Sequence, residues 1–158
     1  MLAERQRDAS DGFNLSLRPE PRYVGTARAF GAAVARHFQA DEERIQDVKV
    51  AISEACSNAI KAHRNSAVNE PIQVVVRQGT STLRYEIIDA GEGFEAPTNP
   101  PPVQTPILSP DSPELFEGGI GLMLIRSLFP DAEVIRNPDG GMTVSFQLAL
   151  DDRTAAAS

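Results

Sequence analysis

The chain has 158 residues, of which 41% are hydrophobic, and a formal net charge of −7. This length and apolar content fit one globular domain with its own core and exclude a chain that is disordered throughout. The acidic balance argues against a general binder of nucleic acids, because binding to phosphate backbones depends on clustered Lys and Arg.

The two ends of the chain and its only cysteine bear on its compartment. Residues 1–12 and 151–158 predict a flexible N-terminal arm and a flexible C-terminal tail. The arm lacks the apolar stretch of a secretory signal, and no apolar run approaches the length of a bilayer span. Cys56 excludes a disulfide within the chain and a cysteine zinc cage, and its apolar helical surroundings predict a buried thiol. We therefore expect a cytoplasmic protein that contacts neither membranes nor nucleic acids directly.

The first part of the chain predicts one strand and two helices. Residues 13–17 alternate between apolar and polar, which is the period of an edge strand. From 22 to about 39, apolar residues recur every three or four positions and predict an amphipathic helix. Asp41 is a candidate N-cap for a second helix, which we expect to run to about His63. The side chains expected to face the core from this second helix are Ile45, Val48, Ile52, Ala55, Cys56 and Ala59.

The second part predicts two strand pairs on either side of a long connection. Residues 72–77 and 83–89 read as strands, and the short link between them predicts a hairpin. The connection 90–119 contains seven prolines, which exclude regular structure, and its length is typical of a functional lid, placed at about 95–118. The remaining predicted elements are a helix over 120–129 and strands over 133–136 and 142–150.

The order of these elements predicts an α+β fold for one domain spanning 13–150. Strands joined by hairpins, with helices collected between them, favour a two-layer sandwich. We expect a mixed, mainly antiparallel sheet that is covered on one face by the helices.

Glu54 and Asn58 lie four positions apart on the second predicted helix and therefore share one face. A carboxylate and an amide oxygen suit Mg²⁺, which binds to one or two protein oxygens and completes its shell with water and phosphate. An ordinary exposed polar pair on a helix has the same spacing.

Asp89 follows an apolar strand and is itself followed by Ala-Gly-Glu-Gly-Phe. A carboxylate at the end of a buried strand can accept a hydrogen bond from an amine in a pocket. Gly91 and Gly93 allow the backbone to turn and to approach a ligand closely. The same residues are also typical of a simple strand-to-loop turn.

A glycine cluster at 118–121 opens the helix predicted after the lid. Free N–H groups at a helix N-terminus suit a phosphate. No Gly-Lys-Ser/Thr follows and no βαβ unit precedes the cluster, so it is neither a P-loop nor a dinucleotide-binding fingerprint.

Taken together and in this order, the three segments resemble the motifs of the gyrase, Hsp90, histidine kinase and mismatch-repair (GHKL) ATPase superfamily. The segment 50–60 (VAISEACSNAI) resembles its N box, 88–94 (IDAGEGF) its G1 box and 117–128 (EGGIGLMLIRSL) its G2 box. Within the superfamily, the short length and the sequence after Gly121 are similar to the bacterial anti-sigma-factor serine kinases. The resemblance covers about residues 13–150 and implies the histidine-kinase-like ATPase fold of the Bergerat type.

The resemblance also implies a role for each motif residue. Asn58 would coordinate Mg²⁺, Glu54 would be the base that activates a serine hydroxyl, and Asp89 would read the adenine amine of ATP. The further ATP contacts that the resemblance implies are Gly91, Gly93, Gly119, Gly121 and Thr143.

The implied function is an ATP-binding anti-sigma regulator that takes part in partner switching during a bacterial stress response. It would sequester a sigma factor, phosphorylate a serine of a STAS-type anti-sigma-factor antagonist, and act as a homodimer. The chain departs from the family pattern at Glu117, where relatives carry an arginine, and at Met142, where they carry a small or hydroxyl residue. These departures keep open an alternative, a nucleotide-gated binding module without kinase activity.

Two other functions are less well supported. A detached histidine-kinase catalytic domain is disfavoured, because no phosphoacceptor helix pair precedes residue 13 and the lid is short. A hydrolase would have to use Glu54 and Asp89 as a carboxylate pair. Lys61, His63 and Arg64 lie at the end of a helix, where cations favour its dipole, so we expect no switch function for His63.

Overall fold

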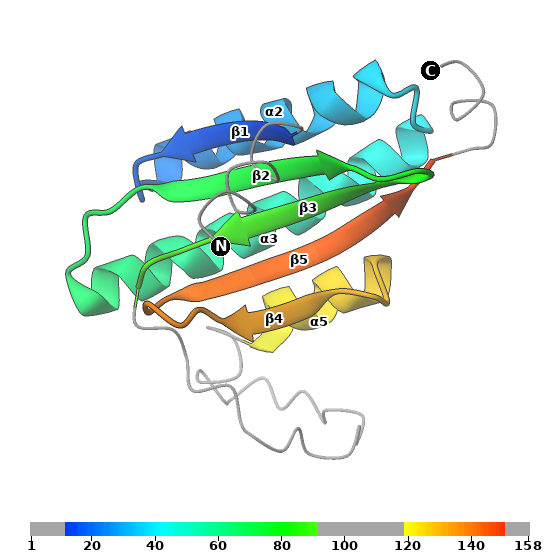
Figure 1. Ribbon diagram of the computed structural model, residues 1–158. Coiled ribbons are helices and arrows are strands. Elements are labelled where there is room, and N and C mark those ends of the chain that lie inside the picture. The colour runs from blue at the N-terminus through cyan, green and yellow to red at the C-terminus, as the bar shows by residue number, and fades with distance from the viewer. Residues whose placement is uncertain (1–11, 92–118, 151–158) are drawn as a thin grey trace, which may run out of the picture.

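The computed structural model describes residues 12–91 and 119–150, with the backbone alone for 119 and 120 (Figure 1). The expected lid over 95–118, the C-terminal tail and nearly all of the N-terminal arm lie outside these residues, as do Gly93 and Glu117.

One five-stranded sheet forms the front layer of the molecule, and the helices cover its other face (Figure 1). The strand order is β1-β2-β3-β5-β4. All four neighbouring pairs are antiparallel. The α+β, two-layer fold is therefore confirmed, and the mainly antiparallel sheet is antiparallel throughout its described part. The strands are β1 (Gly12–Leu17), β2 (Ile72–Gln78), β3 (Thr82–Ile88), β4 (Glu133–Arg136) and β5 (Met142–Ala149).

Alternation along the strands explains which face is buried. In β2, Ile72, Val74 and Val76 are buried against the helices, while the residues between them lie on the other face. Strand β1 lies at the edge of the sheet, as its alternating pattern predicted, with Phe13 opposite Val76.

The helices differ from the sequence prediction mainly at their ends. A 3-10 turn, η1 (Pro21–Tyr23), precedes α2 (Val24–His37) where the sequence predicted one helix from residue 22. Asp41 has extended backbone angles before α3 (Glu42–Ser66), but its side chain makes no capping hydrogen bond. The last helix is α5 (Gly119–Leu128).

The end of α3 lies three residues beyond the predicted one. The helix continues to Ser66, and its C-cap is Ala67, which has a φ of 54°. The N–H of Val68 then donates to the carbonyl of His63 at 3.0 Å. No glycine marks this end in the sequence, and Gly is the usual signal for such a cap.

The core lies between the sheet and the helices. Tyr85 stacks on Phe146 with ring centroids 5.1 Å apart, and Phe129 follows at 4.5 Å, which joins the end of α5 to the sheet. Cys56 is buried as predicted, and burial raises the pKa of its thiol to about 12. Among the described residues, no helix has both the length and the apolar character needed to cross a bilayer.

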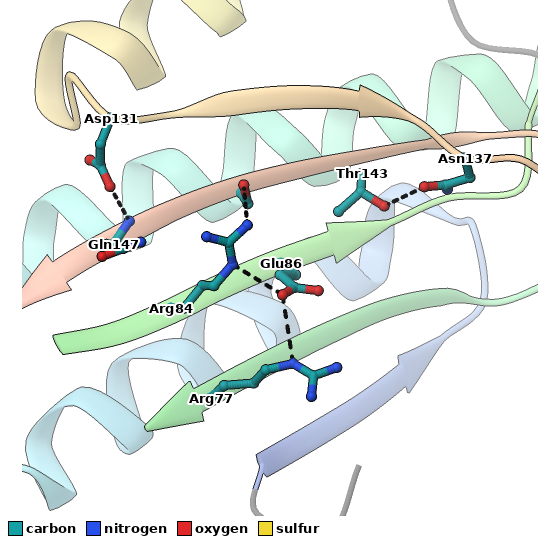
Figure 2. A network of polar contacts seen from close by, with 8 residues as sticks. Arg77, Arg84, Glu86, Asp131, Asn137, Thr143 and Gln147 are labelled. Atoms are coloured by element: carbon teal, nitrogen blue, oxygen red, sulfur yellow. Dashed lines mark hydrogen bonds and ion pairs between the residues drawn. The ribbon is translucent and has the colours of Figure 1, made fainter. Parts of the chain in front are cut away.

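The opposite face of the sheet carries polar side chains that bind one another across the strands (Figure 2). Glu86 accepts from Arg84 at 3.2 Å and lies 3.6 Å from Arg77, and Arg84 also donates to the hydroxyl of Ser145. This network joins β2, β3 and β5. The candidate functional site lies on the helical side of the sheet or at the strand ends.

Candidate functional site

Glu54 and Asn58 lie on one face of α3, both half-buried, and α5 begins directly against them. A Cβ atom added to Gly121 would lie 2.9 Å from Glu54 Oε2 and 3.2 Å from Asn58 Nδ2. Only a glycine allows this approach without movement of the polar pair. The packing of α3 on α5 therefore unites two of the three segments that the sequence singled out.

The first turn of α5 contributes backbone donors at the same place. The first N–H groups of an α-helix have no partner within the helix and carry a partial positive charge. Gly119 and Gly121 belong to this turn, so an anion beside Glu54 and Asn58 would meet backbone N–H groups.

Asp89 directly follows β3 and is held by the first residue of β5. Its N–H donates to the carbonyl of Met142 at 2.9 Å, and the Met142 N–H donates to Asp89 Oδ1 at 3.1 Å. Burial raises the pKa of Asp89 above its usual value, and hydrogen bonds from the N–H groups of Met142 and Gly91 partly offset this rise. A carboxylate has about four acceptor positions, so Asp89 can accept a further donor.

The turn after Asp89 lies on α3. A Cβ atom on Gly91 would lie 2.7 Å from the carbonyl carbon of Ala62 and 2.9 Å from the backbone nitrogen of His63. The N–H of Ala90 donates to Nε2 of His63 at 3.0 Å. Ala62 is one helical turn beyond Asn58, which corresponds to roughly 6 Å along the axis. The turn at residues 89–91 (the Asp89 turn) and the Glu54–Asn58 pair therefore lie next to each other along α3.

Two residues that the sequence reasoning missed also hold Asp89. Asn137 Nδ2 donates to the Asp89 carbonyl at 3.3 Å. Gly141, with a φ of 83°, has no room for a Cβ atom, which would overlap the same carbonyl. The only sequence signal for either was the Pro-Asp-Gly-Gly turn, which predicts a turn but not its contact with Asp89.

Thr143 lies on the face of the sheet away from the helices, where it pairs with Ile88. Its hydroxyl donates to Asn137 Oδ1 at 2.7 Å (Figure 2). The structure therefore connects Thr143 to Asp89 through Asn137, and the ligand contact expected of Thr143 remains a prediction.

The donor set fits Mg²⁺ in its usual protein setting. Among the described residues, no three His, Cys, Asp or Glu side chains form a cluster that could hold a metal by themselves. Glu54 and Asn58 supply one carboxylate and one amide oxygen, which suits a cation that takes most of its ligands from phosphate and water.

A groove of about 680 Å³ extends from Glu54 between α2 and α3. Three cationic side chains line it, Arg28, Arg36 and Lys49, and Glu54 is its only acidic lining residue in the described part of the chain. Helix α2 contains no Asp or Glu, although the whole chain has a net charge of −7. Arg36 is paired with Glu42 through its Nε at 3.0 Å, so the basic character of the groove comes mainly from Arg28 and Lys49.

The sequence of the chain matches a known family over most of its length. The family model of the histidine kinase-like ATPase domain matches residues 17–148. The serine-protein kinase RsbW of Bacillus licheniformis is 35% identical over 144 residues, which cover 87% of this chain and 84% of the relative. The serine-protein kinase RsbW of Bacillus subtilis is 31% identical, with 88% and 86% covered.

Two solved structures share the fold. The RsbU and RsbW domains of Rv1364c from Mycobacterium tuberculosis match with a TM-score of 0.62 at 20% identity, over 88% of this chain and 32% of that longer chain. A chain of the SiaB–SiaC complex from Pseudomonas aeruginosa matches with a TM-score of 0.56 at 16% identity, over 95% and 98%. Together with the family model and the curated relatives, these matches show that the chain belongs to the histidine kinase-like ATPase family, among relatives named as RsbW-type serine-protein kinases.

Proposed function

We propose that the chain binds Mg·ATP between α3, the first turn of α5 and the turn after β3, and transfers the terminal phosphoryl group to a serine of a partner protein. The observation that carries this proposal is the approach of Gly121 to Glu54 and Asn58, one helical turn from the contact of Gly91 with α3. The name of the RsbW relatives, serine-protein kinase, supports the same reaction.

On the same family grounds, we propose that the partners are a sigma factor, which the chain sequesters, and a STAS-type antagonist, which it phosphorylates. The chain would act in the manner of a partner switch, as a homodimer. The RsbW relatives and the structural similarity to a chain of a two-protein complex support this assignment.

Each part of the site has a distinct task in this proposal. Asp89 would accept the adenine amine, and the N–H groups at the start of α5 would face the phosphates. Asn58 would hold Mg²⁺ through its amide oxygen. When bound, Mg²⁺ neutralises phosphate charge and orients the terminal group.

Glu54 would act as the general base. The serine oxygen bonds to the terminal phosphorus, the bond from phosphorus to the bridging oxygen breaks, and ADP leaves with that oxygen. The hydroxyl proton passes to Glu54. The protein contributes mainly by holding these groups in place, which is the usual basis of catalysis in phosphoryl transfer.

The basic groove favours a protein as the phosphoryl acceptor. It leads to Glu54, the proposed base, so an element of the acceptor that lies between α2 and α3 would bring a neighbouring serine to that carboxylate. Arg28 and Lys49 favour an acidic element, because complementary charge speeds and orients association.

Transfer of radiolabelled terminal phosphate from ATP to the purified antagonist tests the proposed function. We expect Glu54→Gln to lower the rate by about 10²–10⁴-fold, the usual contribution of a general base, while ATP affinity stays within a few fold. Glu43→Gln, an exposed acidic residue in the first turn of the same helix, serves as the matched control and should transfer normally.

The outcomes separate the two candidate functions. ATP binding that is lost in Asp89→Asn, together with transfer that depends on Glu54, supports the kinase. ATP binding without transfer in the wild type would instead indicate the nucleotide-gated binding module. Unchanged ATP affinity in Asp89→Asn would remove Asp89 from the adenine end.

A further inference from the structure

His63 is one of the few polar side chains in the core, with only 1% of its surface exposed. Its Nε2 accepts a hydrogen bond from the N–H of Ala90 at 3.0 Å. Its Nδ1 is buried and has no hydrogen-bond partner among residues 12–91 and 119–150. The ring therefore makes one hydrogen bond to the turn after β3 and leaves its second nitrogen unsatisfied within the described part of the chain.

The direction of this hydrogen bond determines the tautomer. A nitrogen that accepts carries no proton, so the neutral ring has its proton on Nδ1. A buried donor without a partner lowers stability, and an apolar side chain of similar size would avoid that cost. Within the described part of the chain, packing therefore does not account for a histidine at this position, whereas the acceptor at Nε2 does.

The Asp89 turn is otherwise held from the side of β5. Met142 donates to the Asp89 carboxylate, and Asn137 donates to the Asp89 carbonyl. The hydrogen bond from Ala90 to His63 ties this turn to a side chain of α3. Helix α3 also carries the Glu54–Asn58 pair.

We infer that His63 is a positioning residue for the nucleotide. By holding the N–H of Ala90, it fixes the Asp89 carboxylate relative to the Glu54–Asn58 pair, so that the adenine end and the phosphate end of one nucleotide fit at the same time. This inference rests on the proposed function, since it assigns both ends to ATP.

The neighbouring cations explain why the sequence predicted only a favourable charge at the helix end for His63. Lys61 and Arg64 are exposed at the end of α3, where their charges favour the helix dipole. His63 has the same place in the sequence, but its ring is buried and bonds to another segment of the chain.

Two substitutions separate positioning from packing. His63→Met keeps a buried side chain of similar volume and removes both the acceptor and the unsatisfied donor. His63→Gln retains an oxygen that can accept from the N–H of Ala90. Calorimetric titration with Mg·ATP gives the affinity, and thermal unfolding without nucleotide gives the stability of each variant.

We expect His63→Met to bind Mg·ATP about tenfold more weakly or worse, which corresponds to the loss of one well-placed hydrogen bond, while its melting temperature is no lower than that of the wild type. We expect His63→Gln to recover most of the affinity. Wild-type affinity in His63→Met would overturn the inference and leave the proposed function intact. A lower melting temperature in His63→Met, with no recovery of ATP affinity in His63→Gln, would make His63 a packing residue and overturn the inference as well. Absence of Mg·ATP binding by the wild type would overturn both.

Discussion

Gly121 decides how closely the start of α5 can approach the polar pair on α3. A side chain at this position would have to displace Glu54 Oε2, which would be only 2.9 Å from the new Cβ atom. The glycine motif is therefore explained by a contact across the fold as much as by the conformational freedom of glycine. The sequence showed the motif, and the structure shows what it touches.

Gly121→Ala should weaken nucleotide binding without unfolding the protein. Alanine favours a helix over glycine by about 1 kcal/mol, so we expect an unchanged or higher melting temperature. We expect ATP affinity to fall about tenfold or more, because the new methyl group displaces Glu54 and Asn58. Gly25→Ala is the control, since its Cβ atom would make an ordinary contact 3.7 Å from Arg28. Calorimetry on both variants checks this, and wild-type affinity in Gly121→Ala would exclude the contact from the site.

At the scale of elements, α2 and α3 pack closely around a second glycine. A Cβ atom on Gly31 would overlap Cδ1 of Ile52, a residue with no exposed surface. The hydroxyl of Tyr85 donates to the Gly31 carbonyl at 2.9 Å, which brings β3 to the same point. This contact sets the spacing of the two helices that line the basic groove.

Gly31→Ala should destabilise the fold although alanine is the better helix residue. Overpacking a filled core costs about 1–3 kcal/mol. The gain in helix propensity from glycine to alanine is only about 1 kcal/mol, so we expect a net loss of stability. Ile52→Val removes the overlapping Cδ1 atom, and by itself it should cost about 1 kcal/mol. We expect the double variant to be more stable than the sum of the two changes predicts. Urea unfolding of the three variants measures this coupling, and strict additivity would show that Ile52 does not limit the space.

The elements themselves could largely be predicted from the sequence. Alternation and helical periodicity depend on near neighbours, so β4 has the predicted bounds and β1, β2, β3 and β5 differ from theirs by one residue at most at either end. The end of α3 could not be predicted in the same way, because its left-handed C-cap is Ala67 rather than the glycine that usually marks such an end. Asp41 takes the N-cap position as predicted, but its side chain makes no capping hydrogen bond, since a suitable residue type does not determine where its side chain points.

At the scale of the whole molecule, charge is distributed unevenly. The chain has 22 acidic and 15 basic residues, yet α2 has no acidic residue and forms one wall of the groove that leads to Glu54. The net charge argued against a general binder of nucleic acids but did not reveal this local surface. The groove exists only because α2 and α3 lie side by side in the fold.

Arg28→Glu should weaken binding of the protein substrate and leave nucleotide binding unchanged. Reversing one charge in the groove should raise the KM for the antagonist several-fold at low salt, and the effect should shrink as salt screens it. ATP affinity should not change. Arg136→Glu is the control, because Arg136 lies on β4, at the opposite edge of the sheet from β1. Steady-state transfer at two salt concentrations gives the result, and equal KM values for the two variants would remove the groove from substrate docking.

By itself, the sequence determined the α+β class and the order of the elements, and it supplied the residues proposed for the site, Glu54, Asn58, Asp89 and the glycines. These features are local: they depend on periodicity, on turn residues and on short motifs. Only the tertiary structure decided that Gly121 meets Glu54, that Asn137 holds Asp89 and that His63 holds Ala90. Each of these contacts joins segments that are far apart in the chain, and it forms because α3 packs against both α5 and the end of β3. No local pattern encodes that packing.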